Sequence, residues 1–203
     1  MTSRVRASVL AVIFLAVIAI PSLAAAQAPA AVGVKAGLNI AKLSFDDEDN
    51  DDVKTLAGLV AGLFVSKAIN DNVGIRGEAL FSQQGAKFEE GGESEKVKLS
   101  YVNVPLLLTA GPSSSGATRF NVFTGPQIGF NTSAKVEFDG ESIDIKDDVK
   151  STDFSWVVGV GLESGKVSAD ARYALGLSSI AEDSSDGKIK NRVFSVTIGV
   201  KIK

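Results

Sequence analysis

The sequence predicts an all-β protein: an eight-stranded antiparallel up-and-down transmembrane β-barrel preceded by a cleaved signal peptide. Three observations predict this fold class. Apolar and polar residues alternate along most of the chain, as they do in strands with two different faces. The breaks between these stretches are alternately short and long. A short apolar segment with the features of an export signal stands near the N-terminus.

The composition excludes several function classes. The 203 residues include no His and no Cys, so Ser-His and Cys-His catalytic pairs, His/Cys zinc sites and disulfides are all ruled out. The formal net charge is -3, which argues against nucleic acid as a partner. We therefore expect a protein that is not an enzyme, with no catalytic, cofactor-binding or metal-binding residues.

The N-terminal segment predicts export. Arg4 and Arg6 precede an apolar run at 8–20, and small residues follow up to Ala26. This order of charge, apolar core and small residues predicts a signal peptide cleaved near Ala26. A retained membrane helix would need about 20 apolar residues, more than this run provides. The expected organisation is a signal peptide at 1–26, a short segment at 27–31 and a barrel domain at 32–203.

The remaining chain divides into eight extended stretches. They are expected at 32–44, 56–69, 73–88, 98–111, 119–138, 153–164, 167–180 and 189–203. The second, fourth and sixth connections are short and rich in turn residues, whereas the odd connections hold most of the acidic residues. In a meander, odd and even connections lie at opposite ends of the barrel. The pattern therefore predicts four acidic loops at one end, with short turns and both termini at the other, periplasmic end.

The alternation also predicts which face meets lipid. In the last stretch Val196 and Ile198 share an apolar face, and Thr197 lies on the polar face. Hydrocarbon offers no hydrogen-bond partner to the backbone, so strands cross a bilayer only as a closed sheet. A soluble lipocalin-like barrel with the apolar face inward is the alternative. It is disfavoured because the polar face carries too few charges for a water-exposed surface.

The polar face carries a small set of charged residues in mid-strand. They are Lys35, Arg76, Glu78, Glu163, Asp170, Arg172 and Lys201. An eight-stranded barrel is narrow enough for its inward side chains to fill it. We therefore expect these residues to form ion pairs that plug the lumen. The alternative is that several of them lie at the rims and never meet.

Some segments leave the pattern unclear. The stretch at 56–65 is apolar on both faces, so its register stays open. Pro105 and Pro126 lie inside strands, and bulges are expected there. The segment near Ile143 is either a loop or an extension of the fifth and sixth strands above the membrane, and a ten-stranded barrel is the alternative to eight strands. The acidic run at 46–52 is interpreted as a solvated loop, because the sharp-turn Gly and distal Glu of a calcium loop are missing.

Four segments resemble a known family. VGVKAGLNIAKLS from Val32, YVNVPLLL from Tyr101, FNVFTGPQIGF from Phe120 and ADARYALGLSSI from Ala169 are similar to small outer-membrane β-barrel domains, the porin-family or PorT-like proteins. The resemblance implies an eight-stranded barrel of the OmpA and OmpX type in the bacterial outer membrane. It also implies periplasmic chaperones and the barrel-assembly machinery as partners during biogenesis. The chain departs from such barrels by ending in Lys203 rather than an aromatic residue.

The expected function follows from the barrel and the resemblance together. We expect a monomeric outer-membrane protein with a structural or surface-interaction role, in contact with outer-membrane lipid and lipopolysaccharide. A narrow passive diffusion channel is the first alternative, and the soluble ligand-binding barrel is the second.

Overall fold

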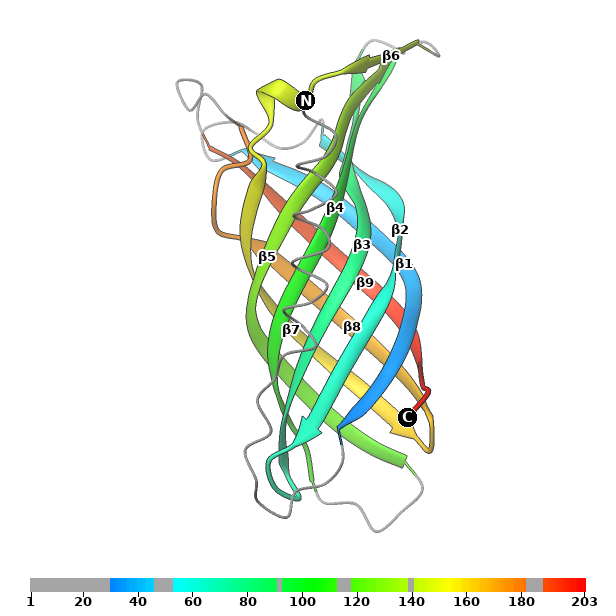
Figure 1. The fold of residues 1–203 in the computed structure, drawn as a ribbon. Coiled ribbons are helices and arrows are strands. Elements are labelled where there is room, and N and C mark those ends of the chain that lie inside the picture. Colours follow the sequence, from blue (N-terminus) through cyan, green and yellow to red (C-terminus); the bar gives the residue numbers. More distant parts are fainter. Residues whose placement is uncertain (1–29, 46–52, 91–92, 113–117, 139–140, 182–187) are drawn as a thin grey trace, which may run out of the picture.

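The computed structural model describes residues 30–45, 53–90, 93–112, 118–138, 141–181 and 188–203. Tilted strands make up almost all of this part of the chain (Figure 1). The predicted signal peptide at 1–26 and the acidic run at 46–52 lie outside the described residues. No helix among the described residues is long and apolar enough to cross a membrane.

The strands run in chain order around a closed wall. Their bounds are β1 Ala31–Phe45, β2 Val53–Ala68, β3 Val73–Glu90, β4 Glu93–Ala110, β5 Thr118–Phe138, β6 Glu141–Asp144, β7 Thr152–Ser164, β8 Val167–Gly176 and β9 Ile189–Lys201. Neighbouring strands pair antiparallel, and β1 pairs with β9, which closes the sheet. The short β6 pairs only with the end of β5, so eight strands form the wall. The predicted eight-stranded antiparallel up-and-down barrel is confirmed.

The short turns and both termini lie at one end of the barrel, as predicted. The third acidic loop, predicted between 88 and 98, is a wrong prediction, because β3 extends to Glu90 and β4 begins at Glu93. The turn between β2 and β3 is short, and the Asn70 side chain accepts hydrogen bonds from two backbone N–H groups within it. The β7–β8 turn uses Gly165 at a φ of 57°, a left-handed conformation that glycine adopts without strain. The first strand begins and the last strand ends at this short-turn end, where Val32 hydrogen-bonds to Lys203. The other end, here called the loop end, carries β6 and the short helix η1, Lys146–Asp148.

The wall is apolar outside and polar inside. Ile198 leaves 62% of its surface exposed, whereas its chain neighbour Thr197, which faces the lumen, leaves 2%. Trp156 and Val158 are likewise exposed, and Arg172 is buried. A water-soluble barrel would show the reverse arrangement. The structure therefore confirms the predicted orientation, with the apolar face directed outward toward lipid.

The structure assigns the register that the sequence leaves open in β2. Leu59 and Leu63 face outward, whereas Val60 and Phe64 face the lumen. The strand is apolar on both faces because its inward side chains pack against lumen residues instead of meeting water. Near Ile143, the chain extends the sheet as β6, one of the two alternatives.

The bulges expected at the two prolines are a wrong prediction. Pro105 pairs with Gln127 and Pro126 with Trp156, and the register is the same on both sides of each. In an antiparallel sheet each N–H points to only one neighbouring strand, so a proline removes one ladder bond without shifting the pairing. The register shifts lie elsewhere, in β2 after Thr55 and between β4 and β5 after Ser100.

The predicted seventh stretch also ends early. Strand β8 stops at Gly176, four residues before the predicted end at Ile180. Ile180 instead enters an apolar cluster inside the loop end, and its N–H donates to the carbonyl of Ile189. The cluster consists of Leu43, Val53, Ala86, Leu99, Tyr101, Ala134 and Ile180.

The polarity of the two faces reverses toward the loop end. On β3 the outward side chain changes from Phe81 to Lys87, while the inward one changes from Glu78 to Ala86. Above this reversal the wall is apolar inside and charged outside, as in a water-exposed barrel. The reversal therefore marks the boundary between the lipid-facing band and the part of the barrel that stands in water.

Candidate functional site: the charged lumen

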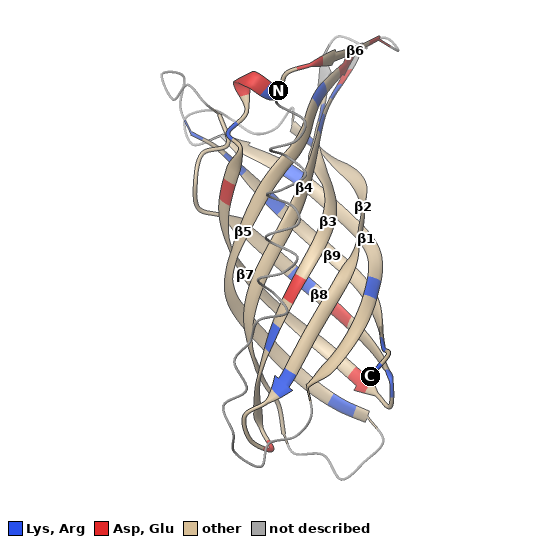
Figure 2. Ribbon diagram, viewed as in Figure 1, with Lys and Arg blue, Asp and Glu red and all other residues tan. Residues whose placement is uncertain are grey.

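The lumen holds the largest group of buried charges in the described part of the chain. Arg76 and Glu78 come from β3, Asp170 and Arg172 from β8, and Lys35 from β1. On β3 and on β8 the two charged residues are two positions apart, and side chains at that spacing point to the same face. Few other charged positions lie between the ends of the wall (Figure 2).

Glu78 lies at the centre of this group. Its carboxylate accepts a hydrogen bond of 2.6 Å from Nη1 of Arg172 and one of 2.9 Å from Nζ of Lys35. Nε of Arg76 lies 3.1 Å from the same carboxylate. Glu78 therefore touches cations from three strands.

Asp170 is the second carboxylate of the group. Its Oδ2 lies 2.6 Å from Nζ of Lys35, 3.3 Å from Nη1 of Arg76 and 3.3 Å from Nη2 of Arg172. All five side chains leave 5% or less of their surface exposed. The five residues, here called the lumen cluster, form one ion-pair network that reaches across the barrel from β1 and β3 to β8.

Two aromatic rings lie beside the cations of the lumen cluster. The Arg76 guanidinium lies 4.4 Å from the ring centre of Phe123, and that of Arg172 lies 5.4 Å from it. Lys35 Nζ lies 5.5 Å from the ring centre of Phe64. The three cations exceed the two carboxylates by one charge, and the electron-rich ring faces offset part of this excess.

Two glycines make room for these rings. A side chain at Gly33 would collide with the ring of Phe64, and one at Gly159 would collide with the ring of Phe123. Each ring therefore occupies space that a side chain at the neighbouring glycine would otherwise fill.

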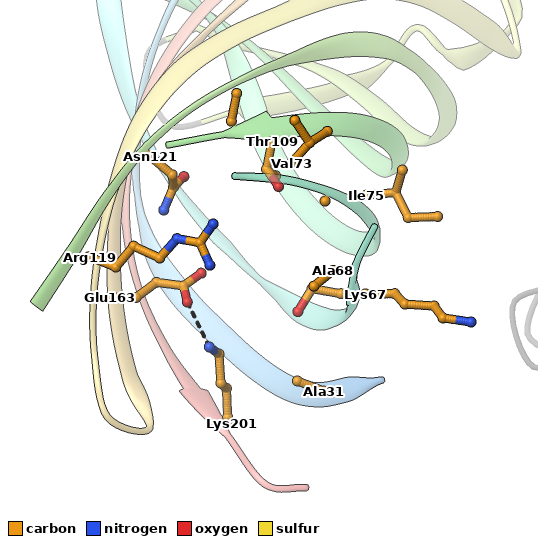
Figure 3. A pocket seen from close by; sticks show the side chains of 13 residues that line it. Ala31, Lys67, Ala68, Val73, Ile75, Thr109, Arg119, Asn121, Glu163 and Lys201 are labelled. Carbon is orange, nitrogen blue, oxygen red and sulfur yellow. Dashed lines mark hydrogen bonds and ion pairs between the residues drawn. The ribbon is translucent and has the colours of Figure 1, made fainter. Parts of the chain in front are cut away.

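The two other predicted lumen residues do not join the cluster. Lys201 Nζ lies 2.7 Å from Oε2 of Glu163, and the two side chains leave 24% and 27% of their surface exposed. This pair lines a cavity of about 190 Å³ at the short-turn end. In Figure 3, Arg119 points into the same space, whereas Lys67 points away from it. Five of the seven residues thus meet in mid-lumen, and two pair near the rim.

The lumen is also filled above the cluster. A buried apolar layer of Leu107, Phe123 and Val157 lies against it. A layer of mixed polar and apolar side chains, which also touches Arg172 of the cluster, leaves a cavity of only about 20 Å³. Still higher, Asp153 accepts hydrogen bonds from Ser178 and Asn191, and the apolar cluster of the loop end follows.

Sequence reasoning missed several lumen residues. Phe123 shares the inward face with Asn121 and Gln127, so its position could have been found by counting along the strand. Phe64 gave no such signal because its strand is apolar on both faces. Asp153 is the first residue of its predicted stretch, so it lies outside the mid-strand positions from which the inward charges are predicted.

The arrangement of the lumen cluster favours a structural role for these residues over a role in catalysis. Each carboxylate of the lumen cluster is held by several cations, so neither is placed as a free acid or base. No group of three or more metal-ligating side chains occurs in the described residues. The cluster can therefore cross-link the strands of the wall and occupy the lumen.

Comparisons with known proteins agree with this architecture. The family model described as outer membrane protein beta-barrel domain matches residues 25–182. No curated protein matches the chain in sequence. Among solved structures, Neisserial surface protein A is 16% identical, with a TM-score of 0.52, over 86% of this chain and 100% of that chain.

Two further barrels are similar at lower scores. OprG from Pseudomonas aeruginosa is 13% identical, with a TM-score of 0.48, over 87% of this chain and 97% of that chain. Ail, the attachment invasion locus protein of Yersinia pestis, is 16% identical, with a TM-score of 0.46, over 86% of this chain and 100% of that chain. At these identities, the structural likeness concerns the fold alone.

Proposed function

The chain belongs to the outer membrane protein beta-barrel domain family, and from this premise we propose that it is a closed, non-enzymatic barrel with a structural or surface-interaction role. Its location is the bacterial outer membrane. In this proposal the lumen cluster and the layers above it plug the barrel, and the loop end faces the outside of the cell.

The observation that carries the proposal is the lumen cluster itself. Lys35 on β1 reaches carboxylates on both β3 and β8, so the ion pairs span the lumen rather than lining one side. Buried ion pairs break only at a large cost, because each partner would be left as an uncompensated charge. A cluster of this kind therefore favours a permanently closed barrel over one that opens for solutes.

The loop end supports a role in surface contact. The described residues there include the exposed acidic side chains of Glu141, Asp144, Asp147 and Asp148. Such a surface would repel anionic partners and attract cationic ones. As a monomer inserted by the barrel-assembly machinery, the protein would then act through this surface and through the lipid around it.

Ion conductance tests the closed barrel. The refolded protein in a planar lipid bilayer is expected to give no steady conductance, because its lumen is filled by side chains. The control is electrophoresis without boiling, in which folded barrel is expected to migrate differently from the boiled sample. Steady, stepwise conductance from correctly folded protein would contradict the plug and would favour the narrow diffusion channel.

A further inference from the structure

The cavity at the short-turn end lies directly beneath the lumen cluster. Gly74 and Asn121 line it, and these residues stand two positions before Arg76 and Phe123 on their strands. Its volume of about 190 Å³ is smaller than the roughly 300–1,000 Å³ of pockets that take drug-sized ligands. The cavity is therefore suited to a small molecule that enters from the short-turn end.

Arg119 brings a positive charge into this cavity. Its Nη2 donates a hydrogen bond of 2.8 Å to the backbone carbonyl of Asp71, and its guanidinium has no carboxylate partner in the described part of the chain. Glu163 lies opposite Arg119 in register, but its Oε2 lies 2.7 Å from Nζ of Lys201 instead (Figure 3). A guanidinium binds carboxylates through two parallel hydrogen bonds. Arg119 thus offers a site for a carboxylate from outside the protein.

Two oxygen atoms next to Arg119 lack a hydrogen-bond donor. Oε1 of Glu163 accepts no hydrogen bond from the described residues. Asn121, two positions after Arg119 on the same face of β5, leaves 5% of its surface exposed, and its Oδ1 has no partner. Buried amide groups are almost always hydrogen-bonded, so an unpartnered one needs an explanation. A ligand with an N–H group close to its carboxylate would supply the missing donor.

Small residues leave space beside these polar groups. A side chain at Gly74 would come within 3.0 Å of Oγ1 of Thr109, so glycine keeps this hydroxyl group uncrowded. The apolar part of the lining includes three alanines, Ala31, Ala68 and Ala110. Such a lining offers apolar contact to a small side chain.

We propose that this cavity binds an α-amino carboxylate, either a free amino acid with a small side chain or the carboxyl end of a short peptide. Arg119 holds the carboxylate, and Glu163 and Asn121 accept hydrogen bonds from the adjacent ammonium or amide N–H group. The short-turn end faces the periplasm in the proposed function, so the ligand comes from that side. A simple carboxylate would leave both acceptors without a donor.

A series of small probes tests the two halves of this site. The refolded protein in detergent micelles is titrated by calorimetry with alanine, alanylalanine, propionate and alaninamide. Propionate lacks the amino group, and alaninamide lacks the free carboxylate. Alanine or alanylalanine is expected to bind about tenfold or more tightly than either, because hydrogen bonds to charged groups are the stronger ones. A preference between alanine and alanylalanine identifies the source of the ligand.

Removing the cation tests the assignment of Arg119. The variant Arg119→Gln is expected to lose about tenfold or more in affinity for alanine and alanylalanine. The matched control is Lys67→Gln, which removes the same charge from a side chain that borders the cavity but points away from it (Figure 3). The control is expected to bind like the wild type. Glu163→Gln is expected to reduce the preference for alanine over propionate.

Electrophoresis without boiling checks that each variant is folded. If Arg119→Gln does not fold, the probe series on the wild type decides the question by itself. Equal affinities for alanine, propionate and alaninamide, no binding of any probe at millimolar concentration, or equal losses in Arg119→Gln and Lys67→Gln would overturn the proposal. Conductance remains a separate test, since a conducting barrel would contradict the plug without removing the groups that form this site.

Discussion

Replacing Glu78 by glutamine is expected to lower the free energy of unfolding by about 3–5 kcal/mol, the cost of removing one partner from a buried ion pair. Glutamine keeps the size of the side chain but loses its charge. Lys35, Arg76 and Arg172 would then share a single carboxylate, Asp170, in a space that water hardly reaches. Urea-induced unfolding of the refolded protein in lipid vesicles measures the loss.

Glu163→Gln is the matched control for this change. It removes the same charge from an ion pair of similar length, 2.7 Å to Lys201, but from a site that water reaches. Ion pairs exposed to this degree contribute about 0–1 kcal/mol. Similar losses in the two variants would show that the lumen cluster does not behave as a buried network.

A double variant separates the charge effect from a packing effect. Adding Lys35→Met to Glu78→Gln removes one cation together with the carboxylate, which returns the net charge of the cluster to its wild-type value of one positive charge. The double variant is expected to lose less stability than the two single variants together, because neighbours in one network are not additive. Full additivity would argue that the residues act separately.

The second large effect concerns the lipid-facing band. Ile198→Arg is expected to destabilise the barrel by about 2–4 kcal/mol, since arginine near the middle of the bilayer loses its hydration. The residue leaves 62% of its surface exposed, so in a water-soluble protein the same change would be nearly harmless. The size of the loss therefore reports directly on contact with lipid.

Ile143 provides the control for this substitution. It leaves 61% of its surface exposed, almost the same as Ile198, but it lies on β6 at the loop end, beyond the polarity reversal. Ile143→Arg is expected to change stability by no more than about 0.5 kcal/mol. Urea unfolding in vesicles compares the two. Equal effects would contradict the position assigned to the membrane.

The alternation of polarity was enough to predict the architecture of this protein. Alternation along the strands, exemplified by Thr197 and Ile198, predicted the eight-stranded wall, its closure and which face meets lipid. The reason is that each strand has lipid on one side and the lumen on the other. Successive side chains point to opposite sides, so the polarity of neighbouring residues indicates both surroundings. The inward direction of all seven predicted charges followed from the same periodicity.

Which of those charges meet in the lumen could not be predicted without the folded barrel. Alternation gives the face of a residue but not its height in the barrel, and height depends on the register between strands. That register brings Lys35, Glu78 and Arg172 together and leaves Glu163 and Lys201 as a separate pair near the rim.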